Sequence, residues 1–358
     1  MTVLRVRVAA RGGSRTGCAG SAHEGSRAFS LCRLYASFPC SISPTLRGTV
    51  SSTAVFRVGA RLSRVTTMLL FGLIVLGSVV RTTGSGLACP DWPLCNGRIL
   101  PPLQFNVLVE WFHRLTALLT SVALFVTVAW VLVHPATRAR LGALAGLAIA
   151  LLFVQVMLGA LTVWKLLSPS VVSGHLAVAL LLFVTMLSIT LVARAASRPA
   201  AVREPRPAGL LATLATATAL AYVQSLLGGI VSTTHAGLAC PDWPACDGRW
   251  FPALTTLAGL QMLHRYGAYA LTAAVMMVAI RSRSAPDAAV RTGGSLAFGL
   301  TLAQVVVGVA NVLGGIPAWL SAVHLANAAA ILATLVATTF RVARMPTGAG
   351  SMALATSP

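Results

Sequence analysis

Charged residues are scarce in this chain of 358 residues: they make up 9% of it, and Asp and Glu together number only 7. Soluble domains usually carry about a quarter of their residues as charges. Hydrophobic residues make up 56% of the sequence, and the mean hydropathy is +0.82. The shortage of charge therefore excludes a soluble domain and indicates an integral membrane protein whose main solvent is the lipid bilayer.

Lysine is almost absent, since Lys165 stands alone among the 27 basic residues. The formal net charge is +20, and residues 1–64 hold ten arginines against one acidic residue, Glu24. A basic extension and basic loops beside membrane spans account for this charge. We therefore expect no nucleic acid partner.

Residues 1–64 form a basic N-terminal extension that lacks any sustained apolar period. Three interpretations stay open: a mitochondrial transit peptide, a disordered cytoplasmic tail, or a start codon placed upstream of the true one. Abundant Ala and Gly with almost no Lys favour a GC-rich bacterial genome. We expect the bacterial cell membrane, with the mitochondrial inner membrane as the alternative, and we place no function in this extension.

Long apolar runs predict eight transmembrane helices, because about 20 apolar residues cross the hydrocarbon core. The runs cover residues 65–82, 107–133, 141–164, 171–193, 209–231, 260–280, 293–313 and 318–340. The loops at 134–140, 194–208, 281–292 and 341–346 carry most of the arginines that lie outside the extension. By the positive-inside rule, these loops and both termini are cytoplasmic, and the loops 83–106 and 232–259 face outward.

The two outward loops are near copies of each other. Residues 86–95 read GLACPDWPLC and residues 237–246 read GLACPDWPAC, at an offset of 151 that becomes 149 further along the chain. The sequence thus predicts an all-α protein of two tandem four-helix bundles, 65–193 and 209–340, joined by the linker 194–208 and followed by a tail, 341–358. Because four spans separate equivalent helices, the bundles should be related by an axis along the membrane normal.

Four histidines recur at equivalent places in the two halves: His113, His175, His264 and His324. Each lies four to seven residues from the outer end of an even-numbered span, a depth of about 5 to 10 Å. Equal depth on two helices of one bundle suits a heme iron held between two imidazoles. The covalent attachment pattern C-x-x-C-H is absent, so the sequence predicts two noncovalent b-type heme sites.

Glu110 lies one helical turn before His113, on the same face of its span. An ionisable group in a membrane span indicates a functional site, and its counterpart in the repeat is the neutral Gln261. A carboxylate can exchange protons where an amide cannot, so we predict Glu110 as the catalytic acid or base and the first half as the reactive one. Arg114 and Arg265 follow two of the histidines and are candidates for binding heme propionates, with snorkelling to the interface as the alternative.

The cysteines outside the extension are Cys89, Cys95, Cys240 and Cys246, all in the outward loops. An oxidising side favours disulfides. Four cysteines allow three connectivities, and we expect one bond within each loop, Cys89 to Cys95 and Cys240 to Cys246. A redox-active pair is the alternative.

Together these residues resemble the heme A synthase family over about residues 65–340. The resemblance implies oxidation of the C8 methyl group of heme O to a formyl group, giving the heme A of cytochrome c oxidase. It also implies that His264 and His324 hold a heme b cofactor, that His113 and His175 receive heme O, and that Glu110 is the essential carboxylate. Heme O synthase and an electron donor or acceptor are expected partners, and a homo-oligomer is compatible with the sequence.

The main alternative is a membrane electron carrier similar to a di-heme cytochrome b. Such a carrier would not need the difference between Glu110 and Gln261, and its hemes would be staggered across both leaflets. A transporter made of two repeats would need broken helices at mid-membrane, and the sequence gives no clear sign of them.

Overall fold

The computed structural model describes residues 51–198 and 204–347, and in these ranges the chain is helical. The helices are α1 (Ser52–Thr82), α2 (Phe105–Val133), α3 (Pro135–Trp164), α4 (Pro169–Ala196), α5 (Leu210–Thr233), the short η1 (Ala236–Leu238), α6 (Leu257–Ser282), α7 (Ala288–Leu313) and α8 (Ala318–Ala343). Most of the N-terminal extension, part of the linker and most of the C-terminal tail lie outside the described residues. The three interpretations of the extension therefore stay predictions.

The eight long helices coincide with the predicted spans. Within the described ranges, each of the eight is long and apolar enough to cross a membrane. The prediction of an all-α membrane protein with eight spans is confirmed.

The first helix begins well before the predicted span at residue 65. Ser51 caps α1 by accepting a hydrogen bond from the amide of Ala54, and the helix continues without a break to Thr82. Its first turns are amphipathic, with Phe56 buried on one face and Arg61 exposed on the other. A search for uniformly apolar stretches misses such turns, which is why the predicted start is too late.

The ends of several other helices follow from local sequence. Pro135 and Pro169 occupy the first positions of α3 and α4, where a missing amide hydrogen costs nothing. The Thr256 hydroxyl accepts from the Gly259 amide at the start of α6, and the Asp287 carboxylate accepts from the Ala289 amide at the start of α7.

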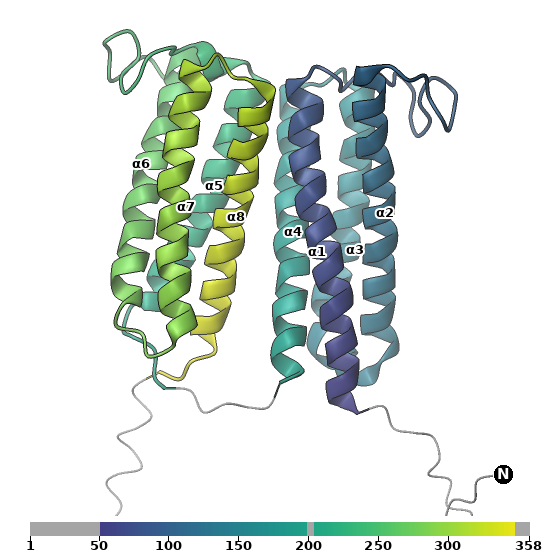
Figure 1. Cartoon of the computed structure of the whole chain (residues 1–358), viewed down its shortest axis with the longest axis vertical. Coiled ribbons are helices and arrows are strands. Elements are labelled where there is room, and N and C mark those ends of the chain that lie inside the picture. Colours follow the sequence, from purple (N-terminus) through teal and green to yellow (C-terminus); the bar gives the residue numbers. More distant parts are fainter. Residues whose placement is uncertain (1–50, 199–203, 348–358) are drawn as a thin grey trace, which may run out of the picture. The chain divides into compact units, whose positions relative to one another are not determined.

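The helices pack in two groups of four. In the first group α1 contacts α2 and α4, and α3 contacts α2 and α4; the same pattern joins α5 to α8 in the second group (Figure 1). Where the groups meet, α1 contacts α8, and α4 contacts both α5 and α8. The axis that would relate the groups stays a prediction.

Threonine pairs link helices inside each group. The hydroxyls of Thr66 and Thr127 lie 2.9 Å apart between α1 and α2, and those of Thr218 and Thr339 lie 3.2 Å apart between α5 and α8. Such hydrogen bonds and close packing replace the hydrophobic driving force that lipid tails do not supply.

The two cysteine loops have the same local structure. Cys95 pairs with Arg98, and Cys246 pairs with Arg249, each through two backbone hydrogen bonds. In the tight turns between them, φ is positive at Asn96 and Gly97 in the first loop and at Asp247 and Gly248 in the second. The two glycines tolerate a positive φ because they have no Cβ. The sequence repeat is therefore a structural repeat in these loops.

Candidate functional site

A cavity of about 960 Å³ is lined by all four repeated histidines. Ligand pockets usually measure about 300 to 1,000 Å³, so this one is large enough for a bulky ligand. His113 comes from α2, His175 from α4, His264 from α6 and His324 from α8. The predicted histidines thus share one cavity.

A glycine of the preceding helix lies against each imidazole. A Cβ atom built on Gly77 would lie 3.3 Å from Cε1 of His113, and one built on Gly159 would lie 3.4 Å from Cε1 of His175. In the second half the separations are shorter, 2.9 Å from Gly228 to His264 and 2.9 Å from Gly308 to His324. In the second half a Cβ would therefore displace the ring, whereas in the first half it would lie at the edge of ordinary contact.

Several nitrogens of these rings have no hydrogen-bond partner. Nδ1 of His113, His175 and His324 is buried and unpartnered among the described residues. Orphaned buried polar atoms are rare and often mark the place of an ion or another bound group. Also among the described residues, no group of three or more His, Cys, Asp and Glu side chains is arranged to hold a metal ion. All four histidines line the cavity, and their use in pairs as ligands of a porphyrin iron stays a prediction.

Glutamine and asparagine side chains distinguish the two pairs. In the first half the Gln155 amide nitrogen lies 3.1 Å from Nε2 of His175. In the second half Asn327 donates to Oε1 of the equivalent Gln304, which donates in turn to the His324 carbonyl oxygen. The residue equivalent to Asn327 is Val178, whose side chain cannot donate a hydrogen bond to Gln155. Gln155 therefore stays in contact with His175.

A second amide contacts the other histidine of the second half. The Gln224 amide nitrogen lies 2.9 Å from Nδ1 of His264 and donates to its carbonyl oxygen at 2.8 Å. The equivalent residue of the first half is Leu73, which cannot hydrogen-bond. The ring of His264 is therefore oriented by a polar neighbour, whereas His113 lacks that neighbour.

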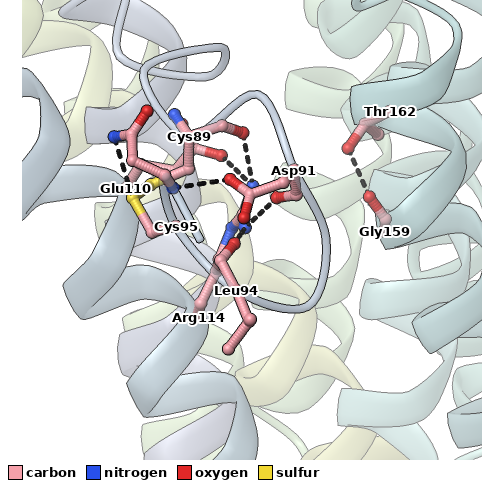
Figure 2. Close-up of polar contacts among 9 residues, drawn as sticks. Cys89, Asp91, Leu94, Cys95, Glu110, Arg114, Gly159 and Thr162 are labelled. Atoms are coloured by element: carbon pink, nitrogen blue, oxygen red, sulfur yellow. Dashed lines mark hydrogen bonds and ion pairs between the residues drawn. A yellow bond between two sulfur atoms is a disulfide. The ribbon is translucent and has the colours of Figure 1, made fainter. Parts of the chain in front are cut away.

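Glu110 is buried, lines the cavity and is bound to the first cysteine loop. Its carboxylate accepts the amide hydrogen of Cys89 at 2.8 Å and forms an ion pair with Arg114 at 2.6 Å. Figure 2 shows Glu110 and Arg114 reaching together from α2 toward the loop that carries Cys89, Asp91 and Leu94. The carboxylate thus joins the loop to the wall of the cavity.

The two candidate propionate partners are also bound to their loops. Arg114 donates to the carbonyl oxygens of Cys89, Asp91 and Leu94, and Arg265 donates to those of Cys240, Pro244 and Ala245. These contacts give both arginines a role in fixing the loops. Their assignment to heme propionates stays a prediction.

The structure pairs the cysteines within each loop, Cys89 with Cys95 and Cys240 with Cys246, as the repeat predicts. Beside the first pair, the half-buried Asp91 carboxylate accepts hydrogen bonds from the backbone amides of Asn96 at 2.6 Å and Gly97 at 2.8 Å. These hydrogen bonds, that of Gly97 first, hold the Asp91 pKa below its usual 3.8, with Arg114 contributing. The first loop is therefore fixed from both sides, by Asp91 and by Arg114.

Sequence reasoning missed the residues around the histidines. Gly77 and Gly228 could have been found as a matched pair of the repeat, at the offset of 151. The other signal is a pair of equivalent positions where one half has an apolar residue and the other a polar one, as in Leu73 with Gln224 and Val178 with Asn327. Arg81 was missed as well: it lines the cavity and donates one hydrogen bond, at 3.1 Å, to the carbonyl oxygen of Ser232, its own counterpart in the repeat.

Comparison with known proteins gives one consistent family. The family model described as cytochrome oxidase assembly protein matches residues 60–106 and 103–336. A heme A synthase of Methylobacterium sp. (strain 4-46) is 28% identical over 322 residues, covering 75% of this chain and 88% of that protein. A heme A synthase of Shouchella clausii is 31% identical over 264 residues, covering 71% and 86%, and one of Symbiobacterium thermophilum is 29% identical over 248 residues, covering 67% and 81%.

Proposed function

Because the chain belongs to the heme A synthase family of cytochrome oxidase assembly proteins, we propose that it oxidises the C8 methyl group of heme O to the formyl group of heme A. With oxygen taken from water, the net change is R–CH3 + H2O → R–CHO + 4 H⁺ + 4 e⁻, and the partner is an electron acceptor. With oxygen taken from dioxygen, R–CH3 + 2 O2 + 4 H⁺ + 4 e⁻ → R–CH(OH)2 + 2 H2O, and the partner is an electron donor. In both cases successive hydroxylations give a geminal diol, which loses water to form the formyl group. The protein itself must bind the porphyrin, orient the methyl group and accept or donate protons.

The observation that carries this proposal is the fourfold pairing of a cavity-lining histidine with a glycine. Two cavity-lining imidazoles in each half, each seated against a glycine of the preceding helix, fit a porphyrin iron held between them. Unpartnered buried Nδ1 atoms on His113, His175 and His324 also support a bound group in this cavity, because such atoms often mark one.

We assign His264 and His324 to a resident heme b, and His113 and His175 to the substrate heme O. The closer glycine contacts of the second half, together with Gln224 and Asn327, support a fixed pair of rings there. In the first half the Gln155 amide occupies Nε2 of His175, so a bound iron must displace it. Because Gln155 competes with the iron for His175, this site suits a substrate heme that binds and is then released. The resident heme b of the second half would supply a path for single electrons.

Glu110 is our proposed proton-transfer group. Its carboxylate lines the same cavity as His113 and is 4% exposed, while Gln261 at the equivalent position is also 4% exposed and cannot ionise. The hydrogen bonds from Cys89 and Arg114 fix the carboxylate at the outer end of the cavity. Protons released by the methyl group would reach the outer side by this route.

The propionates of the bound porphyrins need cationic partners. Arg114 and Arg265 stay candidates, although most of their N–H groups are used by loop carbonyls. We add Arg81, because its guanidinium lines the cavity and makes a single hydrogen bond.

The test is to extract and separate the hemes of a bacterial host that makes heme O but no heme A, with and without this chain. Appearance of heme A supports the proposal. Unchanged heme O, with two hemes retained per purified chain, would instead assign the protein to the electron carriers.

We further propose that the protein resides in a bacterial cell membrane with both termini in the cytoplasm, and that heme O synthase supplies its substrate. The bacterial relatives and the eight membrane-spanning helices support this location. Protease protection of a tag at either terminus in inverted and right-side-out vesicles would test the orientation.

A further inference from the structure

Five arginines surround a second pocket, away from the histidine cavity. The pocket has a volume of about 400 Å³ and lies between the beginning of α1 and the end of α4. Its arginines are Arg57, Arg61, Arg64, Arg194 and Arg198, and all five are exposed. We refer to this site as the arginine pocket.

Among the described residues that line the arginine pocket, none is acidic. On this end of the helices the described acidic residues are Glu204 and Asp287, and Asp287 pairs with Arg341 at 2.5 Å. Among the described residues, none of the five guanidinium groups forms an ion pair or donates a hydrogen bond to the protein. Arginines spaced by three or four residues on one helix repel each other, so the arrangement favours binding of an anion.

The repeat does not require these charges. The positions equivalent to the five arginines in the second half are uncharged: Ala208, Ala212, Ala215, Ala343 and Thr347. Several arginines at the same end of the second half are instead bound internally, since Arg281 donates to Thr213 and Arg291 donates to the carbonyl oxygens of Ala285 and Pro286. The arginine pocket is thus a feature added to the first half alone.

The position of the pocket along α1 indicates what it meets. The 31 residues of α1 measure about 46 Å, whereas the hydrocarbon core of a bilayer is about 30 Å thick. The surplus turns carry Arg57 and Arg61, with Arg64 directly after them, and extend to the level of the lipid headgroups. Guanidinium groups bind phosphate in a two-pronged geometry, and basic pockets between transmembrane helices suit anionic headgroups.

We propose that the arginine pocket binds phosphate groups, supplied by the headgroup of an anionic phospholipid. Binding there would join α1 to α4, the helix that carries His175. The proposal does not depend on the chemistry at the histidines.

Native mass spectrometry of the full chain in detergent would test this, with cardiolipin, phosphatidylcholine or inorganic pyrophosphate added. Wild type should retain cardiolipin in preference to phosphatidylcholine, and Arg61→Ala/Arg194→Ala should weaken that retention by about tenfold or more. The matched control is Arg138→Ala/Arg283→Ala, which removes two exposed arginines at the same end of the helices but outside the pocket. This control should bind cardiolipin like wild type.

Equal weakening by the pocket variant and the control would overturn the proposal, because net charge alone would then explain binding. So would equal binding of cardiolipin and phosphatidylcholine by wild type. Pyrophosphate bound by wild type and not by the pocket variant, without any cardiolipin preference, would likewise overturn the lipid headgroup as the occupant and assign the phosphate to a soluble source. Circular dichroism checks folding, and Arg61→Gln/Arg194→Gln repeats the test if the alanine variant misfolds.

Discussion

A Cβ atom on Gly308 would lie 2.9 Å from Cε1 of His324, closer than side-chain carbons normally approach one another. Gly228 and His264 repeat this relationship at the same distance in the same half of the protein. The imidazoles of the second half are therefore seated directly against the backbone of a neighbouring helix.

Gly308→Ala should displace the His324 ring and lower the heme b content of the purified protein by about tenfold or more, since overpacking costs about 1 to 3 kcal/mol. The matched control is Gly299→Ala on the same helix, where a Cβ meets nothing within 4 Å. Alanine also favours a helix over glycine, so the control should be as stable as wild type or more so. Full heme content in Gly308→Ala, read from the absorption spectrum per chain, would contradict the proposed seat.

The same substitution in the first half should have a smaller effect. A Cβ on Gly159 would be 3.4 Å from Cε1 of His175, which is ordinary contact. We expect Gly159→Ala to reduce heme O binding only a few-fold, with Gly146→Ala on the same helix as the control. Titration of heme O into the purified variants would measure this binding. If Gly159→Ala lost as much heme as Gly308→Ala, the two halves would not differ in how closely glycine seats the imidazole.

The second prediction exchanges the residues that differ beside the histidines. Asn327→Val should free Gln304 to contact His324, as Gln155 contacts His175, and so speed the release of heme b to apomyoglobin by about tenfold. Val178→Asn should do the reverse in the first half and slow the release of heme from His175. If neither exchange changes a release rate, the amides do not decide which heme stays.

Much of this arrangement was predictable, because the repeated cysteine loops and the four histidines follow from a repeat whose offset is 151 at first and 149 further along the chain. What the sequence could not indicate is contact between side chains and backbone. The carbonyl oxygens bound by Arg114 and Arg265 have no sequence signature, so these arginines were predicted to bind propionates or to snorkel to the interface, and their contacts with the loops were missed. Likewise, the arginine pocket is recognised only when α1 and α4 are known to be neighbours.

The third prediction concerns the pH dependence of the first cysteine loop. Since the pKa of Asp91 is lowered in the folded protein, its carboxylate stabilises the loop above the usual value of 3.8. This contribution is lost as the pH falls through the lowered pKa. Hydrogen exchange at the Asn96 and Gly97 amides, corrected for intrinsic rates, should therefore show protection at neutral pH that declines below pH 3.8. Asp91→Asn should weaken the protection at neutral pH and remove its dependence on acid.

The final prediction separates two roles of Glu110, which binds the loop through Cys89 and Arg114 and lines the cavity beside His113. Glu110→Gln keeps an acceptor for the Cys89 amide but loses the ion pair, at a cost of about 1 to 3 kcal/mol. If Glu110 transfers protons, heme A formation should fall by about 10² or more while the heme b spectrum stays unchanged. The readout is the ratio of heme A to heme O in membranes with equal amounts of protein.

Arg114→Gln is the companion variant, because it breaks the same ion pair and leaves the carboxylate in place. If Arg114→Gln loses as much activity as Glu110→Gln, the ion pair itself is what matters, and Glu110 would be a residue that positions the loop. A large loss in Glu110→Gln alone would leave proton transfer as the task of this carboxylate and the first half as the reactive one.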